Sequence, residues 1–166
     1  MKNIALIGFM GSGKTTLAKL LADRLAFDLY EIDEDIVNAS EYSSVNEIFD
    51  RHGELHFREL EKNAIYNAVQ KSNQVISCGG GVVTSENGMQ LLKGNATIVF
   101  LHADFKTIAK RLIGTESRPL FRDMEKAMAL YAQRLPLYKK YADIEIATDD
   151  ETPEVIADKI IAKLKP

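Results

Sequence analysis

The chain has 166 residues, of which 46% are hydrophobic and 27% charged, with a net charge of −3. These values are typical of one folded domain, here 1–166, and they argue against a disordered chain or a basic nucleic-acid-binding protein. No apolar run approaches the roughly 18 residues that a membrane span needs. The single Cys78 cannot form an internal disulfide. We therefore expect a cytoplasmic protein without membrane or nucleic-acid partners, and we expect it to be a monomer.

Short apolar runs alternate with longer segments of helical periodicity. Strands are predicted at 3–8, 28–32, 75–77, 96–101 and 144–147, and helices at 15–25, 44–70, 104–112, 125–141 and 153–164, with a break near Gly53. This alternation predicts an α/β fold of three layers, in which a five-stranded parallel sheet carries helices on both faces. In such folds ligands bind beyond the carboxyl ends of the strands.

A phosphate-binding loop follows the first predicted strand. Residues 8–15 read GFMGSGKT and match the pattern G-x-x-x-x-G-K-[ST] in full, between a strand and a helix. Glycines let successive N–H groups face one point, and the helix N-terminus behind them favours an anion. Lys14 then reaches the β- and γ-phosphates, and the Thr15 hydroxyl ligates Mg²⁺. The pattern predicts an enzyme that binds ATP and Mg²⁺.

Acidic residues follow the second predicted strand, at 33–35. Alternating carboxylates at this edge place Asp33 to hold Mg²⁺ through water and Asp35 to accept a proton from an attacking hydroxyl. An acidic helix start favoured by the macrodipole is the alternative interpretation. Asp104 follows the fourth predicted strand, but its place at the start of a helix favours an N-cap over a metal ligand.

Further candidates come later in the chain. Arg58 and Glu61 share one helix face, either as a surface ion pair or as an arginine fork held for a carboxylate. Gly79, Gly80 and Gly81 suit a substrate lying on bare backbone, with a flexible turn as the alternative. The loop 114–123 is interpreted as a mobile lid that carries Arg118 over the phosphates, unless that arginine is merely solvated. Arg134 is either a surface residue or a second arginine for an acceptor carboxylate.

Together these segments resemble the shikimate kinases from Met1 to about Tyr141. The ordered pattern is GxMGSGK[ST]T, DxD, EIF…GE…FRxxE, GGG, RPL and RLPLY. Each motif is moderate evidence, and six in the right order are strong evidence. The resemblance implies transfer of the γ-phosphate of ATP to the 3-hydroxyl of shikimate, a step toward aromatic amino acids.

The resemblance also implies roles for individual residues. The nucleotide would contact Gly11, Ser12, Gly13, Lys14, Thr15, Thr16, Arg111 near the adenine, and Arg118 from the lid. The metal would be held by Thr15 and Asp33, and shikimate by Asp35, Arg58, Gly79, Gly80, Gly81 and Arg134, within acceptor-binding helices at 33–70. Met10, Phe49 and Phe57 resemble the apolar wall of the acceptor pocket. Lys14, Asp35 and Arg118 are the expected catalytic residues.

Two other functions fit part of the pattern. Another small-metabolite P-loop kinase, such as a gluconate kinase, shares the glycine loop and the lid but does not need FRxxE, GGG and RLPLY together. An ATP-binding regulatory module without an acceptor is disfavoured by the arginines and acids gathered around one pocket. A GTPase is disfavoured because no Asn-Lys-x-Asp segment occurs late in the chain.

Overall fold

The computed structural model describes residues 2–112 and 123–165 and has a parallel sheet at its centre. The strands are β1 (Asn3–Ile7), β2 (Asp28–Glu31), β3 (Gln74–Ser77), β4 (Ala96–His102) and β5 (Ile144–Ala147), in the order β2-β3-β1-β4-β5. All four neighbouring pairs are parallel. This arrangement confirms the predicted five-stranded α/β fold.

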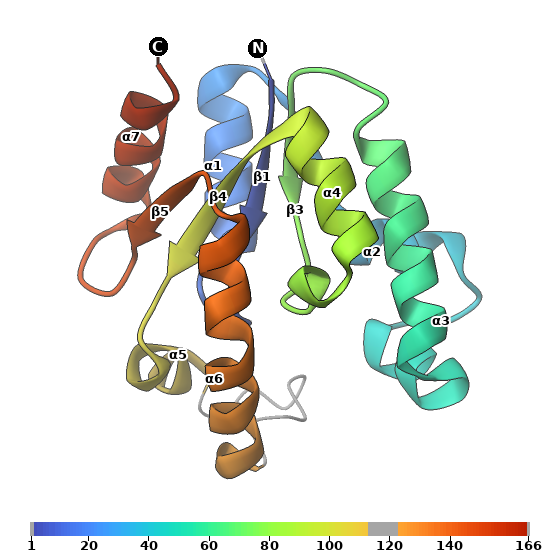
Figure 1. Ribbon diagram of the computed structural model, residues 1–166. Coiled ribbons are helices and arrows are strands. Elements are labelled where there is room, and N and C mark those ends of the chain that lie inside the picture. Colours follow the sequence, from blue (N-terminus) through green and yellow to red (C-terminus); the bar gives the residue numbers. More distant parts are fainter. Residues whose placement is uncertain (1, 113–122, 166) are drawn as a thin grey trace.

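The helices are α1 (Lys14–Leu25), α2 (Ile32–Ala39), α3 (Val45–Ala68), α4 (Glu86–Asn95), α5 (Phe105–Leu112), α6 (Met124–Tyr141) and α7 (Pro153–Leu164), with a 3₁₀ turn at Val82–Thr84. Figure 1 shows helices on both sides of the sheet. No helix among the described residues combines the length and the hydropathy that a bilayer crossing needs.

The central strand explains why both faces must be covered. All five residues of β1 are buried, and successive side chains point to opposite faces. Ile4 and Leu6 pack with the buried side chains of α1 and α7, such as Leu21. Ala5 and Ile7 pack into the larger cluster on the other face, to which α3, α4 and α6 contribute, for example through Tyr138. The three layers therefore bury one apolar strand from two sides.

Two elements differ from the sequence prediction. The second strand ends at Glu31, and Ile32 already begins α2, so 33–35 form the acidic first turn of a helix. The helix α4 was not predicted, because Gly88 and Gly94 lower its intrinsic propensity. Its start is stabilised by Ser85, whose hydroxyl accepts a hydrogen bond from the N–H of Gly88.

The predicted break in the long helix is confirmed at Gly53. This residue has φ 82° and ψ 175° inside α3, a conformation that side chains rarely adopt. The kink separates a short first segment, capped by Ser44, from a longer second segment that carries Arg58 and Glu61. The carboxyl ends of β1, β2, β3 and β4 all lie at one edge of the sheet, at the bottom of Figure 1. The motif residues that follow these strands therefore meet there.

Candidate functional site

The glycine loop passes directly from β1 into α1. Gly11 and Gly13 have φ values of 78° and 95°, which glycine adopts without strain. At Gly11 there is also no room for a side chain, because a β-carbon would lie 2.8 Å from Cδ1 of Leu112. Gly13 precedes α1 and no side chain caps it. The N–H groups at the start of α1 are thus available to an anion.

Lys14 crosses the mouth of this loop. Its Nζ donates hydrogen bonds to the carbonyl oxygens of Gly8 at 2.6 Å and Phe9 at 3.0 Å. The ammonium is therefore held beside the loop rather than in solvent. It borders a cavity of about 220 Å³ lined by Met10, Gly11, Gly13, Lys14, Thr15, Thr16, Glu31, Asp33, Glu34, Ser77, Cys78, Gly79 and Gly80. This cavity joins the glycine loop, the end of β2 and the end of β3.

Three carboxylates at the end of β2 and the start of α2 line the cavity, those of Glu31, Asp33 and Glu34. Asp33 lies against the glycine triplet, since a β-carbon at Gly79 would be 2.8 Å from its Oδ1 and 3.1 Å from its Oδ2. Glu31 lines the same cavity, and burial, followed by its hydrogen bond with Glu34, raises the pKa of the Glu31 carboxyl. Glu31 was not among the residues predicted for this site. Its signal was the spacing of two between Glu31 and Asp33 at the end of a strand.

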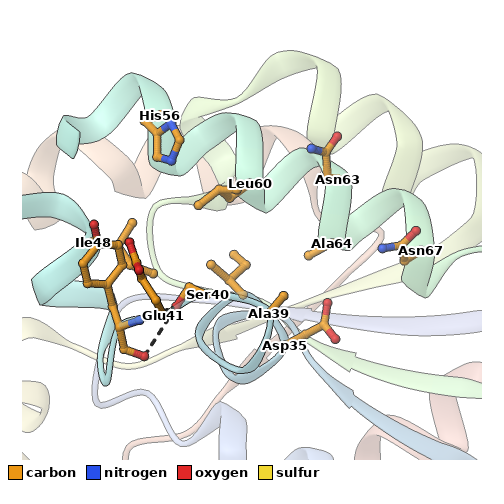
Figure 2. Close-up of a pocket in the computed structure, with 12 residues that line it drawn as sticks. Asp35, Ala39, Ser40, Glu41, Ile48, His56, Leu60, Asn63, Ala64 and Asn67 are labelled. Atoms are coloured by element: carbon orange, nitrogen blue, oxygen red, sulfur yellow. Dashed lines mark hydrogen bonds between the residues drawn. The ribbon is translucent and has the colours of Figure 1, made fainter. Parts of the chain in front are cut away.

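Asp35 does not line this cavity, and its expected contact with shikimate stays a prediction. Its Oδ2 accepts a hydrogen bond from the Tyr30 hydroxyl at 2.7 Å. It lines a separate groove of about 520 Å³ between α2 and α3, together with Leu60, Asn63 and Asn67 (Figure 2). The cause is that α2 begins at Ile32, and residues two apart on a helix point to different sides. The alternation of acids therefore separates Asp33 from Asp35.

Arg58 is held in place by its own helix. Its Nη1 donates to Oε1 of Glu61 at 3.0 Å, and its Nη2 lies 3.4 Å from Oε1 of Glu54. The guanidinium carbon lies 5.3 Å from the ring centre of Phe57 and 5.7 Å from that of Phe49. The side chain of Arg58 is 15% exposed and that of Glu61 only 1%. This is a half-buried, oriented guanidinium and not a surface ion pair.

Each glycine of the triplet faces one charged side chain, and at Gly79 and Gly81 a β-carbon would clash with it. Gly79 faces Asp33, as described above. A β-carbon at Gly80 would lie 3.5 Å from Nη1 of Arg134 and one at Gly81 would lie 2.9 Å from Cζ of Arg58. The triplet after β3 therefore collects an acid and two arginines that are far apart in the sequence. A flexible turn does not require this.

Burial changes the acid–base properties of these groups. Burial raises the pKa of Glu61 to about 7, against the lowering effect of Arg58. Burial likewise lowers the pKa of Arg134. Among the described residues, Nε of Arg58 and Nε of Arg134 are buried and lack hydrogen-bond partners. Buried donors without partners are costly, and an anionic oxygen would satisfy them.

Arg111 connects the glycine loop to the segment that follows the edge strand β5. Its Nη1 donates to the Gly11 carbonyl at 3.0 Å and its Nη2 to the Thr148 carbonyl at 2.8 Å. The guanidinium thus crosslinks the phosphate loop and the segment after β5. Arg118 and the predicted lid at 114–122 lie outside the described residues. Asp123, the last position of the predicted lid, is the N-cap of α6.

The chain was compared with known proteins. A model of the shikimate kinase family, described as "Shikimate kinase", matches residues 10–165. A shikimate kinase of Caldicellulosiruptor bescii is 43% identical, with 98% of this chain and 95% of the relative covered. One of Caldicellulosiruptor saccharolyticus is 44% identical over 98% of this chain and 95% of its own length.

Solved structures agree with these relatives. The shikimate kinase of Acinetobacter baumannii in complex with shikimate has a TM-score of 0.91 at 29% identity, covering 99% of this chain and 96% of that chain. The shikimate kinase of Aquifex aeolicus has a TM-score of 0.85 at 34% identity, covering 98% and 95%. The family model matches nearly the whole chain, the relatives are 43–44% identical, and the solved structures share the fold. The chain therefore belongs to the shikimate kinase family.

Proposed function

We propose that this chain transfers the γ-phosphate of ATP to the 3-hydroxyl of shikimate. The observation that carries the proposal is the placement of Arg58 and Arg134 on Gly81 and Gly80, next to the cavity of the phosphate loop. The relatives named above are shikimate kinases, and one of them was solved with shikimate. An acceptor with a carboxylate and a hydroxyl matches this arrangement, in which Arg58 and Arg134 can bind the carboxylate and Asp33 the hydroxyl.

The acceptor is placed by opposite charges. Guanidinium groups match carboxylates in a bidentate geometry, so Arg58 and Arg134 receive the shikimate carboxylate. The ring then lies over the triplet at 79–81, where no side chain intervenes. Asp33, on the Gly79 side, accepts a hydrogen bond from the hydroxyl that attacks phosphorus.

The donor set of the cavity fits ATP and Mg²⁺. The loop offers N–H groups and Lys14, whereas Thr15, Glu31 and Asp33 offer a hydroxyl and carboxylate oxygens, the ligands that Mg²⁺ prefers. One carboxylate oxygen of Glu31 is buried without a hydrogen-bond partner among the described residues. When bound, Mg²⁺ neutralises charge on the β- and γ-phosphates. Thr15 and Glu31 would hold it, with Asp33 close by.

The chemistry depends on position and charge. In a loose phosphoryl transition state the attacking hydroxyl still carries most of its proton. Asp33 therefore acts mainly by aligning that hydroxyl. Lys14 stabilises negative charge that develops on the transferred group and the leaving oxygen. The bonds from Lys14 to the Gly8 and Phe9 carbonyls keep its ammonium at the loop mouth. A phosphate oxygen can then replace one of those carbonyls.

The test is ADP formation in a coupled assay with ATP and Mg²⁺. Parallel reactions contain shikimate, gluconate, AMP or no acceptor. We expect a rate that depends on shikimate and is absent with the other three. A rate with gluconate would assign a different small-metabolite kinase, and a rate independent of any acceptor would leave an ATPase.

A further inference from the structure

Tyr138 connects the two sides of the acceptor site. It lies one turn after Arg134 in α6, and its side chain is fully buried. Its hydroxyl donates a hydrogen bond to the carbonyl oxygen of Gly80, and the guanidinium of Arg134 lies beside the same glycine, with Nη1 3.5 Å from the position of a β-carbon there. A hydroxyl donates once and accepts through two lone pairs, so it can serve both partners at once. Arg134 is a donor only, so its guanidinium is the group that would donate to this hydroxyl.

The ring of Tyr138 is fixed from behind. It stacks on Phe100 of β4, with ring centres 5.1 Å apart and planes at 18°. Phe100 is itself a buried part of the sheet. The hydroxyl therefore has one position, set by a strand rather than by the loop that it contacts. A rigid support of this kind is what an oriented binding group requires.

We propose that Tyr138 is a positioning residue for the acceptor: its hydroxyl orients both the Gly80 peptide and the Arg134 guanidinium toward the acceptor carboxylate and ring. This inference rests on the proposed function. Without the hydroxyl, the Gly80 carbonyl would lose its partner, and Arg134, whose Nε already has none among the described residues, would lose an anchor. Both changes fall on the acceptor side, whereas Lys14 and the phosphate loop keep their own contacts.

The deciding variant is Tyr138→Phe, which keeps the ring and removes only the hydroxyl. We expect the KM for shikimate to rise roughly tenfold or more, the scale of losing a hydrogen bond to a charged group, while the KM for ATP changes less than about twofold. Tyr141→Phe is the matched control. Tyr141 is also buried in α6, and its hydroxyl makes no hydrogen bond to another described residue. A rise in both KM values, or an equal effect of the two variants, would overturn the proposal.

A double-mutant cycle separates positioning from simple packing. If Tyr138 acts partly through Arg134, Tyr138→Phe should weaken shikimate binding far less in an Arg134→Lys background than in the wild type. Additive losses would show that the hydroxyl does not act through Arg134. Thermal unfolding of every variant, followed with and without ATP, identifies any that fail to fold.

A second measurement does not depend on turnover. In side-chain ¹⁵N spectra, the Arg134 guanidinium should give a resonance in the wild type and in Tyr141→Phe that shifts or broadens in Tyr138→Phe. An unchanged Arg134 resonance would refute the orienting role. If wild-type protein gave no shikimate-dependent ADP, the proposed function would fail, and these spectra would still decide whether Tyr138 holds Arg134.

Discussion

The guanidinium of Arg58 lies where a side chain at Gly81 would be. A β-carbon at this position would lie 2.9 Å from Cζ and 3.0 Å from Nη1 of Arg58, and it would overlap Nη2. The arginine is held from the opposite side by Glu61, at 3.0 Å, and it lies over the rings of Phe49 and Phe57. The absence of a side chain at Gly81 and the ion pair with Glu61 thus together fix the position of the Arg58 guanidinium.

Gly81→Ala should therefore displace Arg58 and weaken acceptor binding. We expect the KM for shikimate to rise about tenfold or more, because charge-assisted contacts of this kind contribute on the order of 1.5–3 kcal/mol, with little change for ATP. Gly94→Ala is the matched control, since nothing lies within 4 Å of a β-carbon there. Alanine at position 94, in the last turn of α4, should preserve or raise the melting temperature. Equal acceptor KM values for the two variants would contradict this role of Gly81.

Glu61 should make stability depend on pH near neutrality. Burial raises the pKa of this carboxyl from 4.5 to about 7, so the folded chain binds more protons than the unfolded chain between these values. The stability associated with the protonated carboxyl is fully present below the unfolded pKa and is lost as the pH rises through the folded pKa. As the pH rises through this window, the free energy of unfolding of the wild type should fall by about 3 kcal/mol relative to that of Glu61→Gln.

Urea unfolding of both proteins at several pH values from 4 to 8.5 would measure that difference. Glu59→Gln is a suitable control, because Glu59 is a neighbouring, 69% exposed carboxylate that pairs with Lys62 on the surface. Its free energy of unfolding should differ little from that of the wild type, because an exposed ion pair contributes less than about 1 kcal/mol. A Glu61→Gln difference that does not change with pH would show that the buried carboxyl does not titrate in this range.

Asp33 and Asp35 should differ sharply despite their spacing of two. Asp33→Asn removes a charge that faces Gly79 and the phosphate-loop cavity, so we expect turnover with shikimate to fall by about 100-fold, the scale of misplacing a reacting group. Asp35→Asn changes a carboxylate bound to Tyr30 in the groove between α2 and α3. It should reduce turnover by no more than a few-fold. The reverse order in a steady-state assay would restore the role first expected for Asp35.

Lys14→Ala should abolish transfer while the protein stays folded. The ammonium is the cation at the mouth of the phosphate loop, and removing a charge-stabilising donor costs about 10²–10³ in turnover. Lys163→Ala, an exposed lysine in the last turn of α7, controls for net charge. Retention of most activity by the Lys14 variant in the coupled assay would contradict its assigned role.

Much of the fold could be predicted because its signals are local. The strands β1 and β4 were recognisable because a parallel strand covered on both faces is apolar along most of its length. The break at Gly53 and the start of α7 at Pro153 follow from single residues. The helix α4 was missed because two glycines hide its pattern, although its contacts with β4 and α3 stabilise it.

The sequence by itself determined the phosphate loop, the alternation of strands and helices, and the identity of most residues at the sheet edge. These features depend on spacing within a few residues, which the backbone geometry of strands, turns and helices translates directly into structure. The resemblance to the shikimate kinases indicated which ligand each of these residues is expected to bind.

Only the tertiary structure decided which acid faces the cavity. Whether Ile32 ends a strand or starts a helix decides the direction of every following side chain. Because it starts α2, Asp33 lines the cavity and Asp35 lines the groove. The pairing of Gly80 with Arg134 and Tyr138, and of Gly81 with Arg58, joins residues far apart in the chain. Such contacts arise from the packing of helices on the sheet, which no local pattern contains.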